Sequence, residues 1–140
     1  MNKLYSNNLP IVNLYKKPSV KSEIITQMIY GEGFKIINKS LKLLKIIINE
    51  DKYIGYIQNK QFFSYIKPTH KVSVLFANTF KGPKYKNKIT NLPYASKIKI
   101  DETKFGFSRF QNSWIKTKNI KPIKFKNKNI FKDIKLFKNT

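Results

Sequence analysis

The sequence predicts an all-β protein of two small barrels in tandem, followed by a short C-terminal helix. Short runs rich in β-branched and aromatic residues, which favour strands, alternate with turns built on proline, glycine and acidic residues. The second half of the chain repeats the order of turns and strands of the first half. The last segment changes to the spacing of an amphipathic helix.

In the first half, three turns separate the expected strands. These are a proline turn at 16–19, a glycine corner at 31–33 and an acidic turn at 49–51. Residues 1–8 form a polar lead-in, and residues 16–28 are expected to form a long loop. The expected strands are residues 11–15, 34–37, 43–48 and 53–57.

The second half matches the first in three places. Residues 14–18 match 79–83, residues 30–36 match 94–100, and residues 55–57 match 113–115. We therefore expect one domain at 9–68 and a second at 69–122, with a linker and the start of a further domain at 123–140. The expected core positions are Ile36, Ile46, Ile57, Ile98, Ile100 and Trp114.

The C-terminal segment predicts a helix because apolar residues recur at helical spacing. These residues are Ile130, Phe131, Ile134 and Phe137. Two apolar turns have little to pack against except the barrels, so we expect a poorly covered apolar face.

The charge is extreme. The 140 residues carry 29 basic and 7 acidic side chains, a net charge of +22, and Arg109 is the only arginine. Such a field attracts anionic polymers, including nucleic acid. Lysine is a solvated point charge that lacks the guanidinium fork favoured for reading bases, so a solvated lysine face is the preferred interpretation.

Several classes of chemistry are excluded or disfavoured by composition. The 140 residues contain no cysteine, which excludes disulfides, thiolate metal sites and a cysteine nucleophile within them, and no cofactor is expected. The single histidine, His70, has no orienting acid nearby in sequence, so we expect a linker residue that satisfies a turn carbonyl. The N-terminus lacks an apolar run of signal-peptide length and no run is long enough to span a membrane, so we expect a cytoplasmic protein without a membrane partner.

The candidate binding residues are Asp51, Tyr53 and Tyr56. An exposed carboxylate beside two tyrosine hydroxyls is able to receive an ammonium group through a charge-assisted hydrogen bond and a ring face. The alternative is that both tyrosines are ordinary strand aromatics on opposite faces, one in the core and one outside. The second half has Phe105 to Phe110 and Trp114 instead, so only the first half has the composition of a site.

The first half resembles the bacterial SH3-like domain at the front of NlpC-type γ-D-glutamyl-dipeptide peptidases. The resemblance covers residues 9–140 as a pair of such domains, and residues 68–72 resemble the junction between them. The last helix resembles the opening helix of the cysteine peptidase domain that follows in this family. The motifs that carry the resemblance are Leu14-Tyr15-x-x-Pro18-Ser19-x-x-Ser22-Glu23, Thr26-Gln27, Gly31-Glu32 and Asp51-x-Tyr53-x-Gly55-Tyr56.

The resemblance implies a part in cell-wall peptide cleavage. Family members cut between γ-D-glutamate and the following diamino acid, with a cysteine and a histidine of the last domain. This chain has neither in place, so we expect a non-catalytic module truncated before the peptidase domain. The family's first domain walls the substrate pocket and favours peptidoglycan-derived peptides with a free N-terminal L-alanine, a role that carries over to Asp51, Tyr53 and Tyr56. Lys52 stands where glycine is common in the family.

Two alternatives remain open. One is a lysine-rich module that binds nucleic acid or other anionic polymers non-specifically. The other is an adaptor of the eukaryotic SH3 kind, which requires Tyr15, Tyr53 and Tyr56 to form one aromatic groove on the surface.

Overall fold

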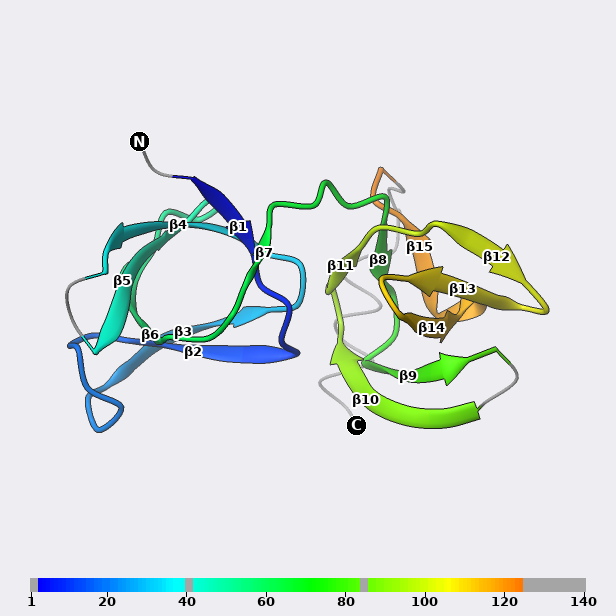
Figure 1. Cartoon of the computed structure of the whole chain (residues 1–140), viewed down its shortest axis with the longest axis horizontal. Coiled ribbons are helices and arrows are strands. Elements are labelled where there is room, and N and C mark those ends of the chain that lie inside the picture. The colour runs from blue at the N-terminus through cyan, green and yellow to red at the C-terminus, as the bar shows by residue number, and fades with distance from the viewer. Residues whose placement is uncertain (1–2, 40–41, 84–85, 125–140) are drawn as a thin grey trace.

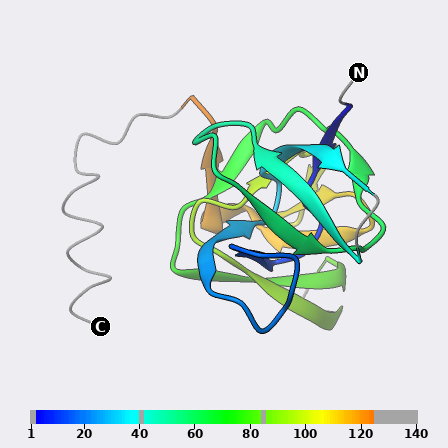
Figure 2. The same ribbon diagram turned by 90° about the vertical axis from the view of Figure 1, so that its left-hand side faces the viewer.

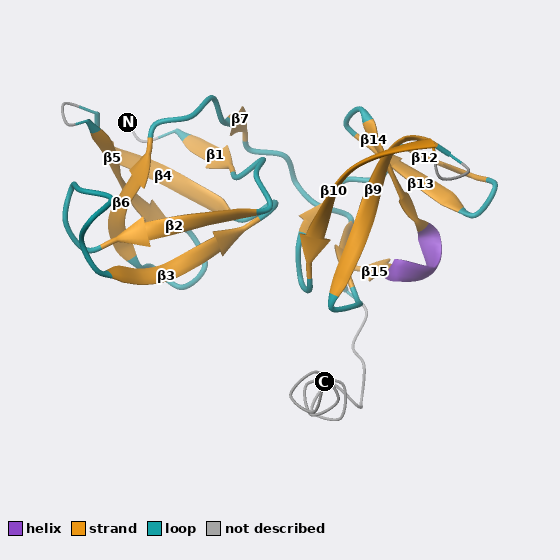
Figure 3. Ribbon diagram, turned by 90° about the horizontal axis from the view of Figure 1, so that it is seen from below, coloured by secondary structure: helices purple, strands orange, loops and turns teal. Residues whose placement is uncertain are grey.

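The chain is almost entirely β-strand in the part that the structure describes. The computed structural model describes residues 3–39, 42–83 and 86–124. Within these ranges the only helical element is one turn of 3-10 helix, η1 (Thr117–Asn119), as Figure 3 shows. The all-β fold class is confirmed, whereas the expected helix around Ile130 to Phe137 falls outside the described residues.

The first half forms one antiparallel sheet that curls on itself (Figure 1). The strand order is β3-β2-β6-β5-β4-β1-β7. The strands are β1 (Leu4–Ser6), β2 (Ile11–Tyr15), β3 (Ile24–Ile29), β4 (Gly33–Asn38), β5 (Leu43–Ile48), β6 (Ile54–Gln58) and β7 (Phe63–Ser64).

The four strands expected in this half are present, with ends that differ by at most one residue. Two expectations were wrong. Residues 16–28 are not one long loop, because β3 begins at Ile24 and pairs along β2. The polar lead-in contains β1, which pairs with β4 and β7.

The core of the first half follows from strand alternation, because residues two apart on a strand face the same side. Val12 and Leu14 of β2, Ile46 and Ile48 of β5, and Ile57 of β6 are all buried. Gly55, two residues before Ile57 on β6, is also buried, and a Cβ there would lie 2.7 Å from Leu14 Cγ. Glycine at this position therefore lets β6 approach β2.

The second half contains a five-stranded sheet, β10-β9-β14-β13-β12, and a three-stranded sheet, β11-β8-β15. The strands are β8 (His70–Val72), β9 (Phe76–Gly82), β10 (Lys86–Pro93), β11 (Lys97–Ile98), β12 (Glu102–Lys104), β13 (Phe107–Phe110), β14 (Ser113–Lys116) and β15 (Ile120–Pro122).

The strand order of the second half parallels that of the first. Strands β10, β9, β14 and β13 follow one another as β3, β2, β6 and β5 do. The pairing also matches at residue level, since Tyr15 lies opposite Tyr56 and Phe80 lies opposite Trp114. These two pairs are equivalent in the sequence repeat, which the topology supports.

Four of the six expected core residues are buried: Ile46, Ile57, Ile98 and Trp114. The other two, Ile36 and Ile100, are half-buried and pack against the first and second cores respectively. Trp114 lies with Phe80 and Phe107 in a cluster of its own, separate from the main core of the second half.

The two halves lie end to end in Figure 1, and Figure 2 gives the view from the side of the first half. Residues Tyr30 and Gly31 of the first half contact the second half at Lys97. The Lys97 amide donates to the Tyr30 carbonyl oxygen at 2.9 Å. The Tyr30 ring packs edge-on against Phe110, with ring centroids 5.8 Å apart. Gly31 has a φ of +86°, and a Cβ there would overlap the Lys97 carbonyl oxygen.

Candidate functional site at the acidic turn

The acidic turn closes the hairpin of β5 and β6. The Lys52 amide donates to the Ile48 carbonyl oxygen at 3.0 Å, and the Ile48 amide donates to the Tyr53 carbonyl oxygen at 2.9 Å. Lys52 has a φ of +61°, a left-handed conformation that glycine adopts without strain. The lysine is therefore held in a glycine conformation, which positions the residues on either side of it.

Asp51 and Tyr53 lie together at this turn. The Tyr53 amide donates to Asp51 Oδ1 at 3.5 Å, a long contact, and both side chains are exposed. The Tyr53 side chain is 47% exposed. The carboxylate and the tyrosine ring are thus both accessible to a ligand.

Tyr56 lies further along the hairpin, in the middle of β6. It is half-buried on the outer face and pairs with Tyr15 of β2 and Lys45 of β5. A lysine beside the ring disfavours an ammonium ligand there. The alternative interpretation, in which one of the two tyrosines lies in the core, was wrong, because the inward positions of β6 are Gly55 and Ile57.

A half-buried glutamate adjoins the turn from the glycine corner. Glu32 Oε1 accepts a hydrogen bond from the Ile29 amide at 3.1 Å. Burial raises the pKa of the Glu32 carboxyl, and the charges of Asp51 and Glu50 raise it further, against the lowering effects of the Ile29 amide and of Lys97. Glu32, Glu50 and Asp51 therefore share one electrostatic neighbourhood, which we call the acidic corner.

The second half of the chain contributes a lysine to this corner. Lys97 Nζ forms an ion pair with Glu50 Oε1. The Lys97 side chain is 22% exposed and that of Glu50 is 66% exposed, so the pair lies at the rim of the contact between the halves. Glu50 is thus engaged, which leaves the exposed Asp51 carboxylate as the most accessible of the three acids.

A groove of about 220 Å³ lies beside the corner. Its lining includes Gly33, Glu50, Tyr65 and Lys97. Within residues 3–39, 42–83 and 86–124, no group of three acidic or histidine side chains has the arrangement needed to hold a metal ion. The groove lining contains one acid, Glu50, and two lysines, Lys67 and Lys97, so the carboxylate available to a cationic group of a ligand is that of Asp51 at the turn beside it.

Sequence reasoning missed Glu32 and Lys97 at this site. Glu32 had a local signal, since it is an acid between two glycines in a chain with few acids. Lys97 had none, because it reaches the corner only through the docking of the two halves. His70 was expected to satisfy a turn carbonyl, and its Nδ1 instead lies 2.7 Å from Thr69 Oγ1. Burial lowers the pKa of the His70 ring.

Comparisons with known proteins find a family match for the segment that contains this hairpin. Residues 14–62 match the family model of the bacterial dipeptidyl-peptidase SH3 domain. Among solved structures, the chain is similar to NlpC2 from Trichomonas vaginalis, at 16% identity and a TM-score of 0.38. That match covers 86% of this chain and 48% of the other, so the chain spans about half its length. No curated protein matches significantly. Across the described ranges, no helix is long and apolar enough to cross a membrane.

Proposed function

We propose that this chain is the substrate-pocket module of a cell-wall peptide endopeptidase, because residues 14–62 match the family model of the bacterial dipeptidyl-peptidase SH3 domain. In this role residues 9–68 and 69–122 are two SH3-like domains, and the chain itself performs no catalysis. The repeated strand order of the two halves supports the second domain. The catalytic step belongs to a cysteine peptidase domain of the NlpC type that acts together with this module.

The substrate group recognised by the first domain is the free N-terminal ammonium of the peptide. The observation that carries this proposal is the exposed Asp51 carboxylate next to the accessible Tyr53 ring, on the hairpin of the matched segment. The carboxylate accepts a charge-assisted hydrogen bond from the ammonium, and the ring offers its negative face. Tyr56 lines the adjoining outer face of β6, where it contacts parts of the peptide beyond the ammonium.

An exposed ion pair is too weak to bind the peptide by itself, so the proposed site needs a second protein surface that covers it. An ammonium that meets a carboxylate on an open surface gains at most about 1 kcal/mol, because water screens both charges. A peptidase domain that covers the hairpin excludes that water and strengthens the contact. The isolated chain is therefore expected to show no measurable binding of L-Ala-γ-D-Glu peptides at submillimolar concentration.

The test uses both the isolated chain and a chain extended with the peptidase domain. Asp51→Asn and Tyr53→Phe in the extended chain should each lower kcat/KM for a peptide with a free N-terminal L-alanine. Asp101→Asn is the matched control, since Asp101 is an exposed acid of the second half. Calorimetric titration of the isolated chain should show no heat of binding. Tight binding by the isolated chain, or unchanged kinetics in both variants, would refute the proposed role.

A further inference from the structure

The three-stranded sheet of the second half carries a row of three lysines. Lys71 of β8, the middle strand, lies directly opposite Lys97 of β11 on one side and directly opposite Lys121 of β15 on the other. Neighbouring strands are about 4.7–4.9 Å apart, so the row crosses the sheet over roughly 10 Å. We call these three residues the lysine row.

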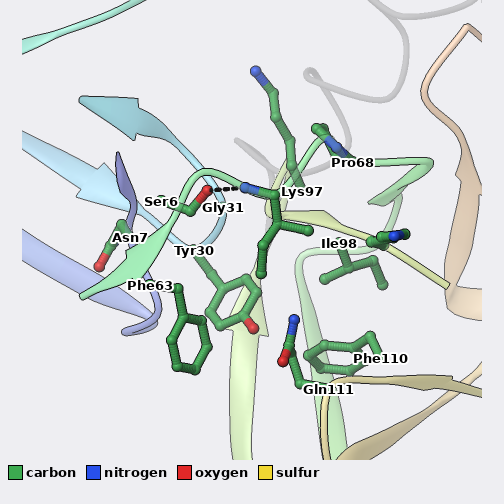
Figure 4. A pocket seen from close by; sticks show the side chains of 12 residues that line it. Ser6, Asn7, Tyr30, Gly31, Phe63, Pro68, Lys97, Ile98, Phe110 and Gln111 are labelled. Carbon is green, nitrogen blue, oxygen red and sulfur yellow. Dashed lines mark hydrogen bonds between the residues drawn. The ribbon is translucent and has the colours of Figure 1, made fainter. Parts of the chain in front are cut away.

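The lysine row lies on the outer face of this sheet, because the residues beside the lysines fill the core. On each strand the lysine has a buried apolar neighbour, and these neighbours are Val72, Ile98 and Ile120. Side chains alternate along a strand, so the lysines face away from that core. Figure 4 shows this for β11, where the Lys97 side chain extends away from Phe110. Lys121 is exposed and Lys71 is half-buried.

The charges of the lysine row oppose the folding of this sheet. Like charges directly opposite each other on neighbouring strands are destabilising, and Lys71 has such a neighbour on both sides. Glu50 forms an ion pair with Lys97 at one end of the row. Within the described ranges, no acidic side chain forms an ion pair with Lys71. An anion that binds across the row would offset the repulsion.

The composition of the three strands favours an anion that is recognised by its charge alone. Strands β8, β11 and β15 contain no arginine, the side chain that pairs bidentately with base edges, and no aromatic ring on which a base stacks. Their outer positions also lack the apolar side chains that strengthen binding to a lipid surface. Lysines act as point charges for phosphate oxygens, and a row of them suits several phosphates in line.

We propose that the lysine row binds a linear phosphodiester polymer through its backbone charges, with no contribution from bases. Successive phosphates of the polymer meet the ammonium groups of neighbouring strands, and Lys71 is the central contact. The net charge of +22 attracts such a polymer from a distance, whereas the row gives it one defined place on the surface. The inference does not depend on the proposed recognition of a peptide ammonium by Asp51.

The test is the binding of the full chain to a base-free phosphodiester oligomer, followed by fluorescence anisotropy at several salt concentrations. The logarithm of the affinity should fall linearly with the logarithm of salt concentration, and an oligothymidylate of the same length should bind equally well. Lys71→Gln should weaken binding and reduce the salt slope by about 0.7–1. Lys121→Gln, at the exposed end of the row, should do the same, and Lys71→Arg should retain binding because it keeps the charge.

Lys45→Gln is the matched control, because it removes the same charge from a different sheet. Lys45 is also half-buried on an inner strand, β5, but it lies opposite Asn38 and Tyr56 rather than opposite other lysines. Its affinity and salt slope should stay close to those of the wild type. Equal losses in Lys71→Gln and Lys45→Gln would overturn the inference, because binding would then follow net charge alone.

A second measurement needs no ligand. At low salt, Lys71→Gln should raise the thermal midpoint of the free protein, because it removes repulsion on both sides of β8, and the gain should shrink as salt screens the charges. Lys45→Gln should show no such gain. A lower midpoint for Lys71→Gln would contradict the inferred repulsion. Tighter binding of the oligothymidylate than of the base-free oligomer, or binding only to vesicles of anionic phospholipid, would overturn the proposed partner.

Discussion

Gly31 is the residue at which the backbones of the two halves meet. It has a positive φ, and any side chain there would overlap the Lys97 carbonyl oxygen, which belongs to the residue whose amide bonds to Tyr30. Gly106 also has a positive φ, of +78°, and has open space around it. A substitution at Gly106 therefore measures the energetic cost of the left-handed backbone alone. The same substitution at Gly31 measures that cost together with the cost of steric overlap.

Gly31→Ala should therefore destabilise the chain more than Gly106→Ala does. The left-handed conformation alone costs an alanine about 1–2 kcal/mol, which is the whole expected effect at Gly106. At Gly31 the overlap adds to it and separates the halves. Urea denaturation of both variants measures the difference. Equal losses would show that the halves do not depend on this contact.

Glu32 makes the stability of the folded protein depend on pH. Its folded-state pKa is raised, mainly by burial, so folding favours the protonated carboxyl. Stability from this group is present at acidic pH, where both states are protonated, and is lost as pH rises, because the unfolded state gives up its proton first. Glu32→Gln should then stabilise the protein at pH 7 and have little effect at a pH well below the usual carboxyl range.

Urea midpoints at the two pH values check this expectation for Glu32. Glutamine keeps an oxygen that accepts the Ile29 amide, so the hydrogen bond is preserved. Glu23→Gln serves as the control, because the Glu23 side chain is 73% exposed. A midpoint for Glu32→Gln below that of the wild type at pH 7 would contradict the account.

At the scale of elements, the hairpin of β5 and β6 holds Asp51 and Tyr53 through a turn in which Lys52 is strained. Lys52→Gly should raise the free energy of unfolding, because the left-handed conformation costs a lysine about 1 kcal/mol or more and glycine adopts it freely. Lys60→Gly, outside the strands, controls for the greater freedom of glycine in the unfolded chain. A loss of stability in Lys52→Gly as large as in Lys60→Gly would contradict this reading.

An element could be predicted from the sequence where neighbouring residues carry its pattern, and it was missed where the structure depends on residues far apart in the chain. Strands β2, β4, β5 and β6 could be predicted because their alternating residues face a buried core. β3 was missed because Ile24 and Ile25 of this edge strand are exposed, which blurs the alternation, and because serines and a proline precede it. At the site, Asp51 and Tyr53 are local to one turn, whereas Lys97 joins it from 47 residues away, a contact that a local pattern cannot encode.

At the scale of the whole molecule, the docking of the halves creates two different surfaces. The acidic corner receives Lys97 from the second half, and a separate groove of about 260 Å³ combines Asn8 and Phe63 with Gln111 and Asn112. The exposed Asp51 carboxylate suits a cationic group, whereas the separate groove has no charged side chain in its lining from the described ranges.

Discrimination between free and acetylated peptides tests the central claim most directly. The measurement is kcat/KM of the chain extended with the peptidase domain, for L-Ala-γ-D-Glu peptides with a free and with an acetylated N-terminus. A charge-assisted hydrogen bond of about 1.5–3 kcal/mol predicts a preference for the free peptide of roughly tenfold or more, which Asp51→Asn should largely remove. Equal rates on the two peptides, or a preference that persists in Asp51→Asn, would contradict the account.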